Sequence, residues 1–326
     1  MTKRNARAIV AVVLSWACGC VPSGEEAVGA SRGAVEMQNG MMLNGMMLNG
    51  MMLNGMMLNG AQLTGTLGSG QTVTAAELLG VTIERAAKLE DGRLIALRID
   101  DVRPYVIDNE VLLYDISYRD DTDGSWQPLC HDPWGGIVPA IPVAGRWDQR
   151  QGVAGGGARI DDGSITLACT GYAIAKCVMA GYKPWKSVQV CDGASQTCRT
   201  VSLASHHQAC TRMLRADYCG DGTPHTADGT ILNVYDGVGI QADQFEWDVK
   251  TEWTPDGAAC LNAQGFKNVD QIWGALPCRA SLASAVTQRS CGVAPQAKFF
   301  RGTTLLMTEM WQESINTHCL DCRDAL

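Results

Sequence analysis

Two histidines and two aspartates lie close together in the C-terminal half of the chain. His206 and His207 are adjacent, and Asp217 and Asp221 follow them. Imidazole and carboxylate groups are the usual general acids and bases of hydrolases. Cys210 has the i+3 or i+4 spacing that would bring a thiol beside these histidines on a helix. These four histidine and aspartate residues are therefore the candidates for a hydrolase-type catalytic site.

The sequence motifs that usually accompany such chemistry are absent. The chain has no His-Glu-x-x-His, no Gly-x-Ser-x-Gly and no P-loop. The glycine-rich segment 152–157 is not followed by a helix start with phosphate-binding spacing. A cysteine held in a disulfide also cannot act as a nucleophile. The sequence therefore favours a non-catalytic protein without a cofactor, and an enzyme remains the alternative.

The same aspartates also resemble part of a calcium-binding loop. An EF-hand loop has oxygen ligands at positions 1, 3, 5 and 12 and glycine at position 6. Asp217, Asp221, Gly222 and Asp228 match positions 1, 5, 6 and 12, but Cys219 occupies position 3. We expect a solvated turn here, with Asp217, Asp221 and Asp228 as the candidate metal ligands if a cation binds.

The N-terminus has the features of an export signal. Three basic residues precede an apolar run over 8–17, which is too short to span a bilayer. Small residues then precede Cys20, as in bacterial lipoprotein signals, where the cysteine is lipidated and becomes the first residue. Cleavage before Cys20 leaves an even number of other cysteines, whereas lipidation of Cys18 leaves an odd number. We predict a signal peptide over 1–19 and a lipid on Cys20, with free secretion as the alternative.

The mature chain is expected to be acidic and extracytoplasmic. The full chain has a formal charge of −8, and loss of the signal peptide removes three basic and no acidic residues, which gives −11. A strongly acidic protein is a poor ligand for nucleic acid. The expected partners are the membrane, through the lipid anchor, and an envelope protein or a glycan, on which tryptophan can stack.

The other mature cysteines all lie in the C-terminal part of the chain. In an oxidising compartment they form a disulfide framework. Zinc is the alternative, but only Cys319 and Cys322 have the Cys-x-x-Cys spacing of a zinc site. The turn-rich loop from Cys191 to Cys198 predicts a hairpin closed by a local bridge. The twelve cysteines are Cys130, Cys169, Cys177, Cys191, Cys198, Cys210, Cys219, Cys260, Cys278, Cys291, Cys319 and Cys322.

A tether over 20–35 precedes six pentads over 36–65. Four of them, over 41–60, are identical Met-Met-Leu-Asn-Gly units. A leucine every five residues resembles pentapeptide-repeat proteins, whose leucines point into a square β-solenoid. We favour a spacer, because solenoids need several stacked coils to bury a core. The nine methionines of the pentads could also bind Cu(I), so a metal-binding envelope protein is a further alternative.

Two folded regions are expected after the repeat. Residues 66–125 predict a small β domain with strands at 93–99 and 111–118, and with a helical turn that Thr74 caps together with Glu77. Residues 126–326 predict a disulfide-rich domain. The fold class is α+β and β-rich: a small β domain followed by a disulfide-stapled mixed α/β domain.

A short amphipathic helix is predicted over 202–215. Leu203, His207, Cys210 and Leu214 share one face at helical spacing. Arg212 and Arg215 stand near its end and Asp217 follows, which predicts a local ion pair or a C-terminal cap. A strand is predicted after the aspartate turn, at 230–235.

Five spaced motifs lie in and around this helix. Ala-Lys-Cys precedes Gly-Tyr-x-Pro-Trp, His-Gln-Ala-Cys-x-Arg follows, and Ala216-Asp217-Tyr218-Cys219 leads into Gly-Asp-Gly. Over roughly residues 125–300 the chain resembles the ADYC domain of exported bacterial proteins and lipoproteins, which is named after the Ala-Asp-Tyr-Cys signature. The resemblance implies fold and location and brings no established activity. The sequence thus favours a non-catalytic structural or binding module of the cell envelope.

Overall fold

The computed structural model of the protein describes residues 37–38, 56–66, 69–88, 94–120, 124–192, 197–226, 228–244, 249–261, 278 and 304–309. The predicted signal peptide, Cys20, the tether, most of the pentads and Cys291, Cys319 and Cys322 lie outside these residues. Among the described residues, no helix has the length and apolar character that crossing a bilayer requires.

The largest sheet is antiparallel and six-stranded, in the order β10-β9-β7-β6-β5, with β8 beside β7. Its strands are β5 (Thr82–Lys88), β6 (Leu94–Pro104), β7 (Leu112–Asp120), β8 (Gln127–Pro128), β9 (Ala140–Trp147) and β10 (Arg159–Cys169). The two predicted strands at 93–99 and 111–118 are confirmed as β6 and β7. The expected division between residues 125 and 126 falls inside this sheet, because β8, β9 and β10 follow it and β5, β6 and β7 precede it.

Smaller sheets complete the β-rich fold. One sheet has three strands in the order β2-β3-β4, and another has five in the order β1-β13-β16-β14-β15. A third consists of the hairpin of β11 and β12. Their strands are β2 (Met56–Asn59), β3 (Gln62–Thr66), β4 (Thr72–Thr74), β1 (Met37–Gln38), β13 (Ile231–Asp236), β14 (Val249–Thr254), β15 (Gly257–Leu261), β16 (Leu306–Glu309), β11 (Ser187–Asp192) and β12 (Thr197–Ser202). The strand predicted at 230–235 is thereby confirmed as β13.

The last two pentads form an antiparallel hairpin. The final Met-Met-Leu-Asn-Gly unit supplies β2 and the next pentad supplies β3, so Leu58 lies directly opposite Leu63. Leu63 is buried, and its N–H donates to the Tyr114 hydroxyl at 3.0 Å. In these two pentads the leucines therefore pair across strands, where a solenoid would place them in successive turns of one coil.

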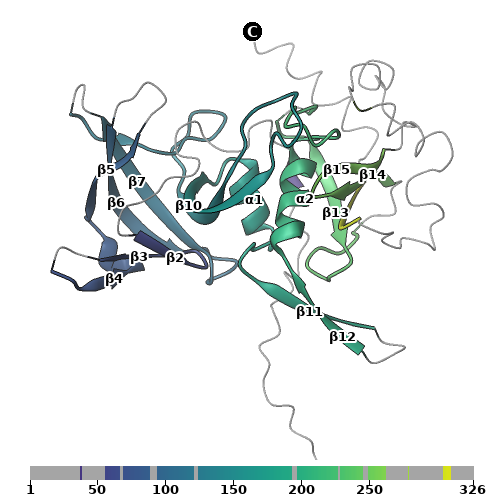
Figure 1. Ribbon diagram of the computed structural model, residues 1–326, viewed down its shortest axis with the longest axis horizontal. Coiled ribbons are helices and arrows are strands. Elements are labelled where there is room, and N and C mark those ends of the chain that lie inside the picture. The colour runs from purple at the N-terminus through teal and green to yellow at the C-terminus, as the bar shows by residue number, and fades with distance from the viewer. Residues whose placement is uncertain are drawn as a thin grey trace, which may run out of the picture.

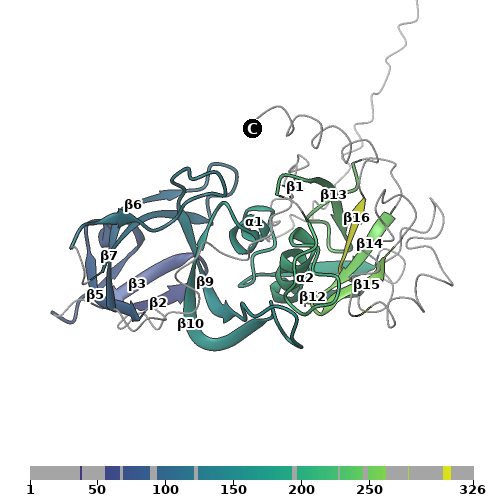
Figure 2. The ribbon, with the colours of Figure 1, turned by 90° about the horizontal axis from the view of Figure 1, so that it is seen from above.

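Two α-helices, α1 (Ala173–Met179) and α2 (Ala204–Leu214), lie between the two largest sheets (Figures 1 and 2). α2 confirms the helix predicted at 202–215. The expectation that only one of its faces is buried is wrong, because every residue from His206 to Leu214 is buried. The physical reason is that α2 packs against α1 on one side and against β14 and β15 on another.

The short helix η1 (Ala75–Leu78) confirms the predicted helical turn. The Thr74 N–H donates to Glu77 Oε2 at 2.9 Å, which is half of a capping box. The buried Leu78 of this turn packs with the core of the large sheet.

Four disulfides join described cysteines: Cys130–Cys169, Cys177–Cys210, Cys191–Cys198 and Cys219–Cys278. Cys260 is disulfide-bonded as well. The predicted local bridge between Cys191 and Cys198 is confirmed, and it closes the hairpin of β11 and β12. The Cys177–Cys210 bridge joins α1 to α2 in the core, with both cysteines fully buried.

Candidate functional site

A buried ion pair lies at the C-terminal end of α2. Arg212 Nη1 donates to Asp217 Oδ2, and the two side chains are 3% and 0% exposed. The same Nη1 donates to the carbonyl of Gly156, and Arg212 Nε donates to the carbonyl of Pro255 at 3.1 Å. The predicted local ion pair is confirmed, and its partners reach into two other parts of the chain.

The end of α2 explains why Asp217 reaches back to Arg212. The Ala216 N–H donates to Met213 O and the Asp217 N–H donates to Arg212 O, both at 2.9 Å. This pair of bonds is a Schellman motif, which requires a left-handed residue after the helix. Ala216 takes that conformation, with φ +49°, and its methyl group is buried in the core. The Ala-Asp dipeptide therefore both ends the helix and turns the carboxylate toward the preceding turn.

The Asp217 carboxylate has further donors on both oxygens. The Asp221 N–H donates to Oδ1 at 3.1 Å, and the Gly222 N–H donates to Oδ2 at 3.0 Å. Asp221 in turn accepts the Thr223 N–H at 2.9 Å, and Asp228 is exposed. Within the described part of the chain, no three acidic, histidine or cysteine side chains gather as a metal site. The structure thus uses Asp217 to bind a guanidinium and backbone amides.

The glycine-rich segment at 152–157 packs over this ion pair. Gln208 Nε2 donates to the Gly157 carbonyl at 3.0 Å. A Cβ atom at Gly157 would lie 2.6 Å from Arg212 Nη1, and one at Gly222 would overlap the Arg150 carbonyl oxygen. Glycine at these positions therefore lets backbone segments far apart in the sequence approach the ion pair closely.

The second arginine at the end of the helix, Arg215, is held by the turn that follows Asp217. Arg215 Nη2 donates to the Gly222 carbonyl at 2.6 Å. Burial lowers the pKa of Arg215 to about 10, and the charge of Asp217 opposes that shift. The guanidinium therefore stays charged at physiological pH and adds to the positive field around Asp217.

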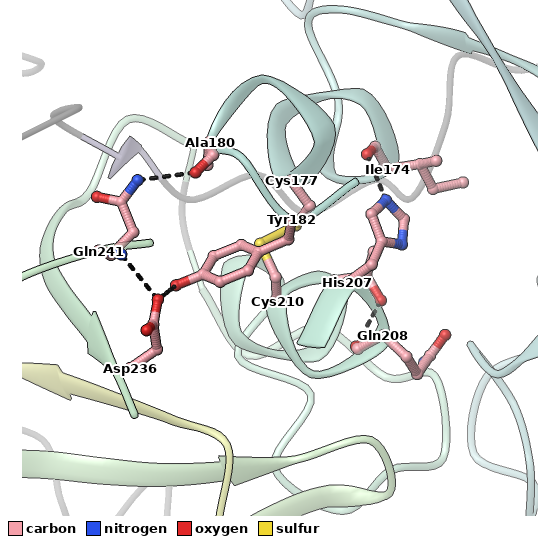
Figure 3. Close-up of a disulfide and its surroundings, with 10 residues drawn as sticks. Ile174, Cys177, Ala180, Tyr182, His207, Gln208, Cys210, Asp236 and Gln241 are labelled. Carbon is pink, nitrogen blue, oxygen red and sulfur yellow. Dashed lines mark hydrogen bonds between the residues drawn. A yellow bond between two sulfur atoms is a disulfide. The ribbon is translucent and has the colours of Figure 1, made fainter. Parts of the chain in front are cut away.

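The two histidines lie apart from the aspartates. His207 is fully buried, and its Nε2 lies 3.0 Å from the Ile174 carbonyl (Figure 3). Its ring centroid lies 5.6 Å from that of Trp147. His206 stacks on Tyr182 with ring centroids 6.3 Å apart. Consecutive residues on a helix point about 100° apart, so the two imidazoles face different neighbours.

Burial also sets the charge of these histidines. It lowers the pKa of His207 to about 3, although the hydrogen bond to the Ile174 carbonyl acts in the opposite direction. Burial lowers the pKa of His206 as well. Cys210 is bonded to Cys177, so no thiol stands beside the imidazoles. The structure therefore does not bring the four predicted catalytic residues together, and each has a structural partner.

A second, partly buried network surrounds Asp236, and the sequence did not predict it. The Tyr182 hydroxyl donates to Asp236 Oδ2 at 2.8 Å (Figure 3). The same carboxylate accepts the N–H groups of residues 238–241. Gln241 Nε2 donates to the Ala180 carbonyl at 2.8 Å, so this loop is bound to the end of α1. Burial raises the pKa of Tyr182 well above its ordinary value. The sequence pattern that indicates this loop is the Asp-Gly-x-Gly run at 236–239, in which the aspartate carboxylate accepts backbone N–H groups of a tight turn.

The ADYC domain model matches residues 75–267, more than half of the chain. The chain belongs to the ADYC-domain family. No curated protein and no solved structure matches it significantly. The match begins earlier than the extent of 125–300 expected from the motifs, and it includes the strands of the large sheet from β5 onward. The ADYC signature itself lies at the buried ion pair, where Asp217 is the charged partner and Cys219 is bonded to Cys278.

The largest exposed aromatic side chain among the described residues of this ADYC protein is that of Trp134, at 73% exposure. It lies on the loop between β8 and β9, which also carries the exposed Ile137. Asp132 Oδ1 accepts the N–H groups of Trp134 and Gly136 at 2.9 and 2.7 Å. The loop is therefore held in one shape while its apolar side chains face solvent.

Close packing at the ADYC ion pair predicts a large cost for Gly222→Ala. The residue has φ +85°, and the added methyl group would overlap the Arg150 carbonyl. We expect the free energy of unfolding to fall by about 3 kcal/mol or more, as measured by urea denaturation. Gly155→Ala is the matched control, since Gly155 has φ +78° but open space around a Cβ. Its expected loss is about 1 kcal/mol, and equal losses would contradict this packing.

Burial of neutral His207 predicts a stability that falls in acid. Its pKa is about 3 in the folded chain against an ordinary value of 6.5, so the unfolded chain binds more protons between these values. The free energy of unfolding therefore decreases as pH falls from about 6.5 to about 3, at up to about 1.4 kcal/mol per pH unit from this residue.

The variant His207→Gln keeps an N–H donor for Ile174 and removes that titration. Urea denaturation across this pH range should show a shallower slope than wild type. The acid loss that remains reports His206 and His225, whose pKa values burial lowers, together with Glu110, Asp148 and Asp162, whose pKa values side-chain hydrogen bonds lower. Exposed His131→Gln controls for loss of an imidazole. Identical slopes for wild type and His207→Gln would disprove the prediction.

Proposed function

We propose that this ADYC protein is an exported, lipid-anchored component of the cell envelope that acts as a non-catalytic structural or binding module. The observation that carries the proposal is that three of its four candidate acid–base groups are buried in structural contacts. His206, His207 and Asp217 are 2%, 0% and 0% exposed. A substrate would have to enter the core to reach them.

The charge states of these groups support the same proposal. His207 is uncharged at physiological pH because its pKa is about 3, and its proton is held by the Ile174 carbonyl. A general base works best when its pKa lies near the working pH. Asp217 is neutralised by Arg212 and bound by two backbone amides. Its hydrogen-bonding capacity therefore serves the fold.

The disulfides support a location outside the cytoplasm. Disulfides form and persist in oxidising compartments, and reducing compartments keep cysteines as thiols. Four bridges join described cysteines, and three of them connect segments more than thirty residues apart. The lipid on Cys20 is our proposal for what keeps the exported chain at a membrane, and it rests on the N-terminal sequence.

The loop from β8 to β9 is the surface that we propose for binding. Trp134 and Ile137 are exposed apolar side chains on a loop with two backbone hydrogen bonds to Asp132, and such bonds reduce the conformational entropy that is lost when a partner covers the loop. Exposed tryptophans dominate the binding energy of many interfaces and also stack on sugars. An envelope protein or glycan is the partner that this surface and the proposed location suggest.

The binding claim predicts that Trp134→Ala reduces attachment to the envelope. A variant of the protein that begins at residue 21 and carries no lipid should bind isolated cell envelopes saturably. The substitution Trp134→Ala in this variant should weaken that binding about tenfold or more. Leu79→Ala is the control, since Leu79 is also exposed but lies on a different loop. Absence of saturable binding, or hydrolase activity that His207→Gln abolishes, would refute the proposal.

The anchor predicts a defined mass for the mature protein. Unreduced protein from the membrane fraction should begin at Cys20, carry acyl chains and take up no alkylating reagent. Cys20→Ser should move the protein from the membrane fraction to the soluble fraction. A lipid-free mass or several alkylated cysteines in the wild type would overturn this part of the proposal.

A further inference from the structure

The hairpin of β11 and β12 projects from the body of the molecule (Figure 1). Its two strands pair over six positions, from Ser187 opposite Ser202 to Asp192 opposite Thr197. Cys191 and Cys198 lie directly opposite each other near the outer end and are joined by a disulfide. This bridge crosses a two-stranded sheet that no third described strand supports.

The exposure of this bridge differs from that of the others. Both Cys191 and Cys198 are exposed. The cysteines of the Cys130–Cys169 and Cys177–Cys210 bridges are at most 3% exposed, and Cys219 and Cys278 are half-buried. Exchange requires an external thiolate to reach a sulfur atom of the bridge. Among the four bridges, the hairpin bridge is therefore the one most open to attack.

We propose that the Cys191–Cys198 bridge is a site of thiol–disulfide exchange with an external dithiol. One thiolate of the dithiol attacks one sulfur of the bridge, the bond between the two sulfurs breaks, and the other cysteine leaves as a thiolate that takes up a proton. The second thiol of the dithiol then attacks the mixed disulfide. The dithiol ends as a disulfide, and Cys191 and Cys198 end as two thiols.

The hairpin's packing determines what this exchange changes. Val188 is the one buried side chain among the hairpin's described residues, so few apolar contacts hold the strands together. A two-stranded hairpin alone is at best marginally stable. The base is fixed, because the Leu203 N–H donates to the Lys186 carbonyl at 2.9 Å and Lys186 Nζ contacts Glu110 at 2.6 Å. Reduction therefore opens the outer hairpin and leaves the core in place.

The test is differential alkylation of the full mature protein under native conditions. The protein is treated with a limiting amount of dithiothreitol or of reduced thioredoxin, alkylated, and mapped by peptide mass. With dithiothreitol, Cys191 and Cys198 should be labelled about tenfold or more faster than Cys177 and Cys210, the internal control. Labelling with thioredoxin as well would identify a protein dithiol as a competent partner, and labelling with dithiothreitol alone would identify a small dithiol.

A variant separates local opening from unfolding. Cys191→Ser with Cys198→Ser should remove the fast labelling and leave the thermal unfolding of the core unchanged. In wild type, the reduced protein should lose hydrogen-exchange protection at β11 and β12 only. Equal labelling rates for the hairpin and core cysteines, or no labelling before global unfolding, would overturn the proposal. These outcomes are independent of envelope binding through Trp134.

Discussion

The buried ion pair between Arg212 and Asp217 is the interaction around which the ADYC fold is arranged. Taking two charges out of water costs several kcal/mol per ion unless each finds its partner and further hydrogen bonds. Arg212 meets this need with the Asp217 carboxylate and two backbone carbonyls, and Asp217 meets it with two backbone amides. Helix α2, the glycine-rich segment at 152–157 and the turn between β14 and β15 must therefore all be in place together.

This arrangement has a consequence for function. The imidazoles and carboxylates that suggested catalysis are used to end a helix, fix a loop and fill the core. Their hydrogen-bonding capacity is directed at neighbours in the same chain, as with His207 at Ile174 and Asp217 at Arg212. Under the proposed function, interaction with other molecules depends on the surface, where Trp134 is an exposed apolar side chain and Cys191–Cys198 is an exposed disulfide.

Local features of this structure were predictable from the sequence, and long-range ones were not. The predictable features each depend on residues within a few positions of one another or on a short turn. They are the turn at Thr74 and Glu77, strands β6 and β7, helix α2, the hairpin bridge and the ion pair. The contact between Gly156 and Arg212 joins positions more than fifty residues apart, and Tyr182 meets Asp236 across a similar separation. Burial of α2 on several sides depends on its packing against α1, β14 and β15, and the large sheet continues past residue 126 through strand pairing. No local sequence pattern encodes either contact.

The most direct test of this account is a double-mutant cycle on Arg212 and Asp217, with Arg212→Gln, Asp217→Asn and the double variant measured by urea denaturation. If the ion pair organises the fold, the two single losses are large and the coupling free energy is about 2 kcal/mol or more. A coupling free energy within about 0.5 kcal/mol of zero would show that the two side chains act independently, and would contradict the account.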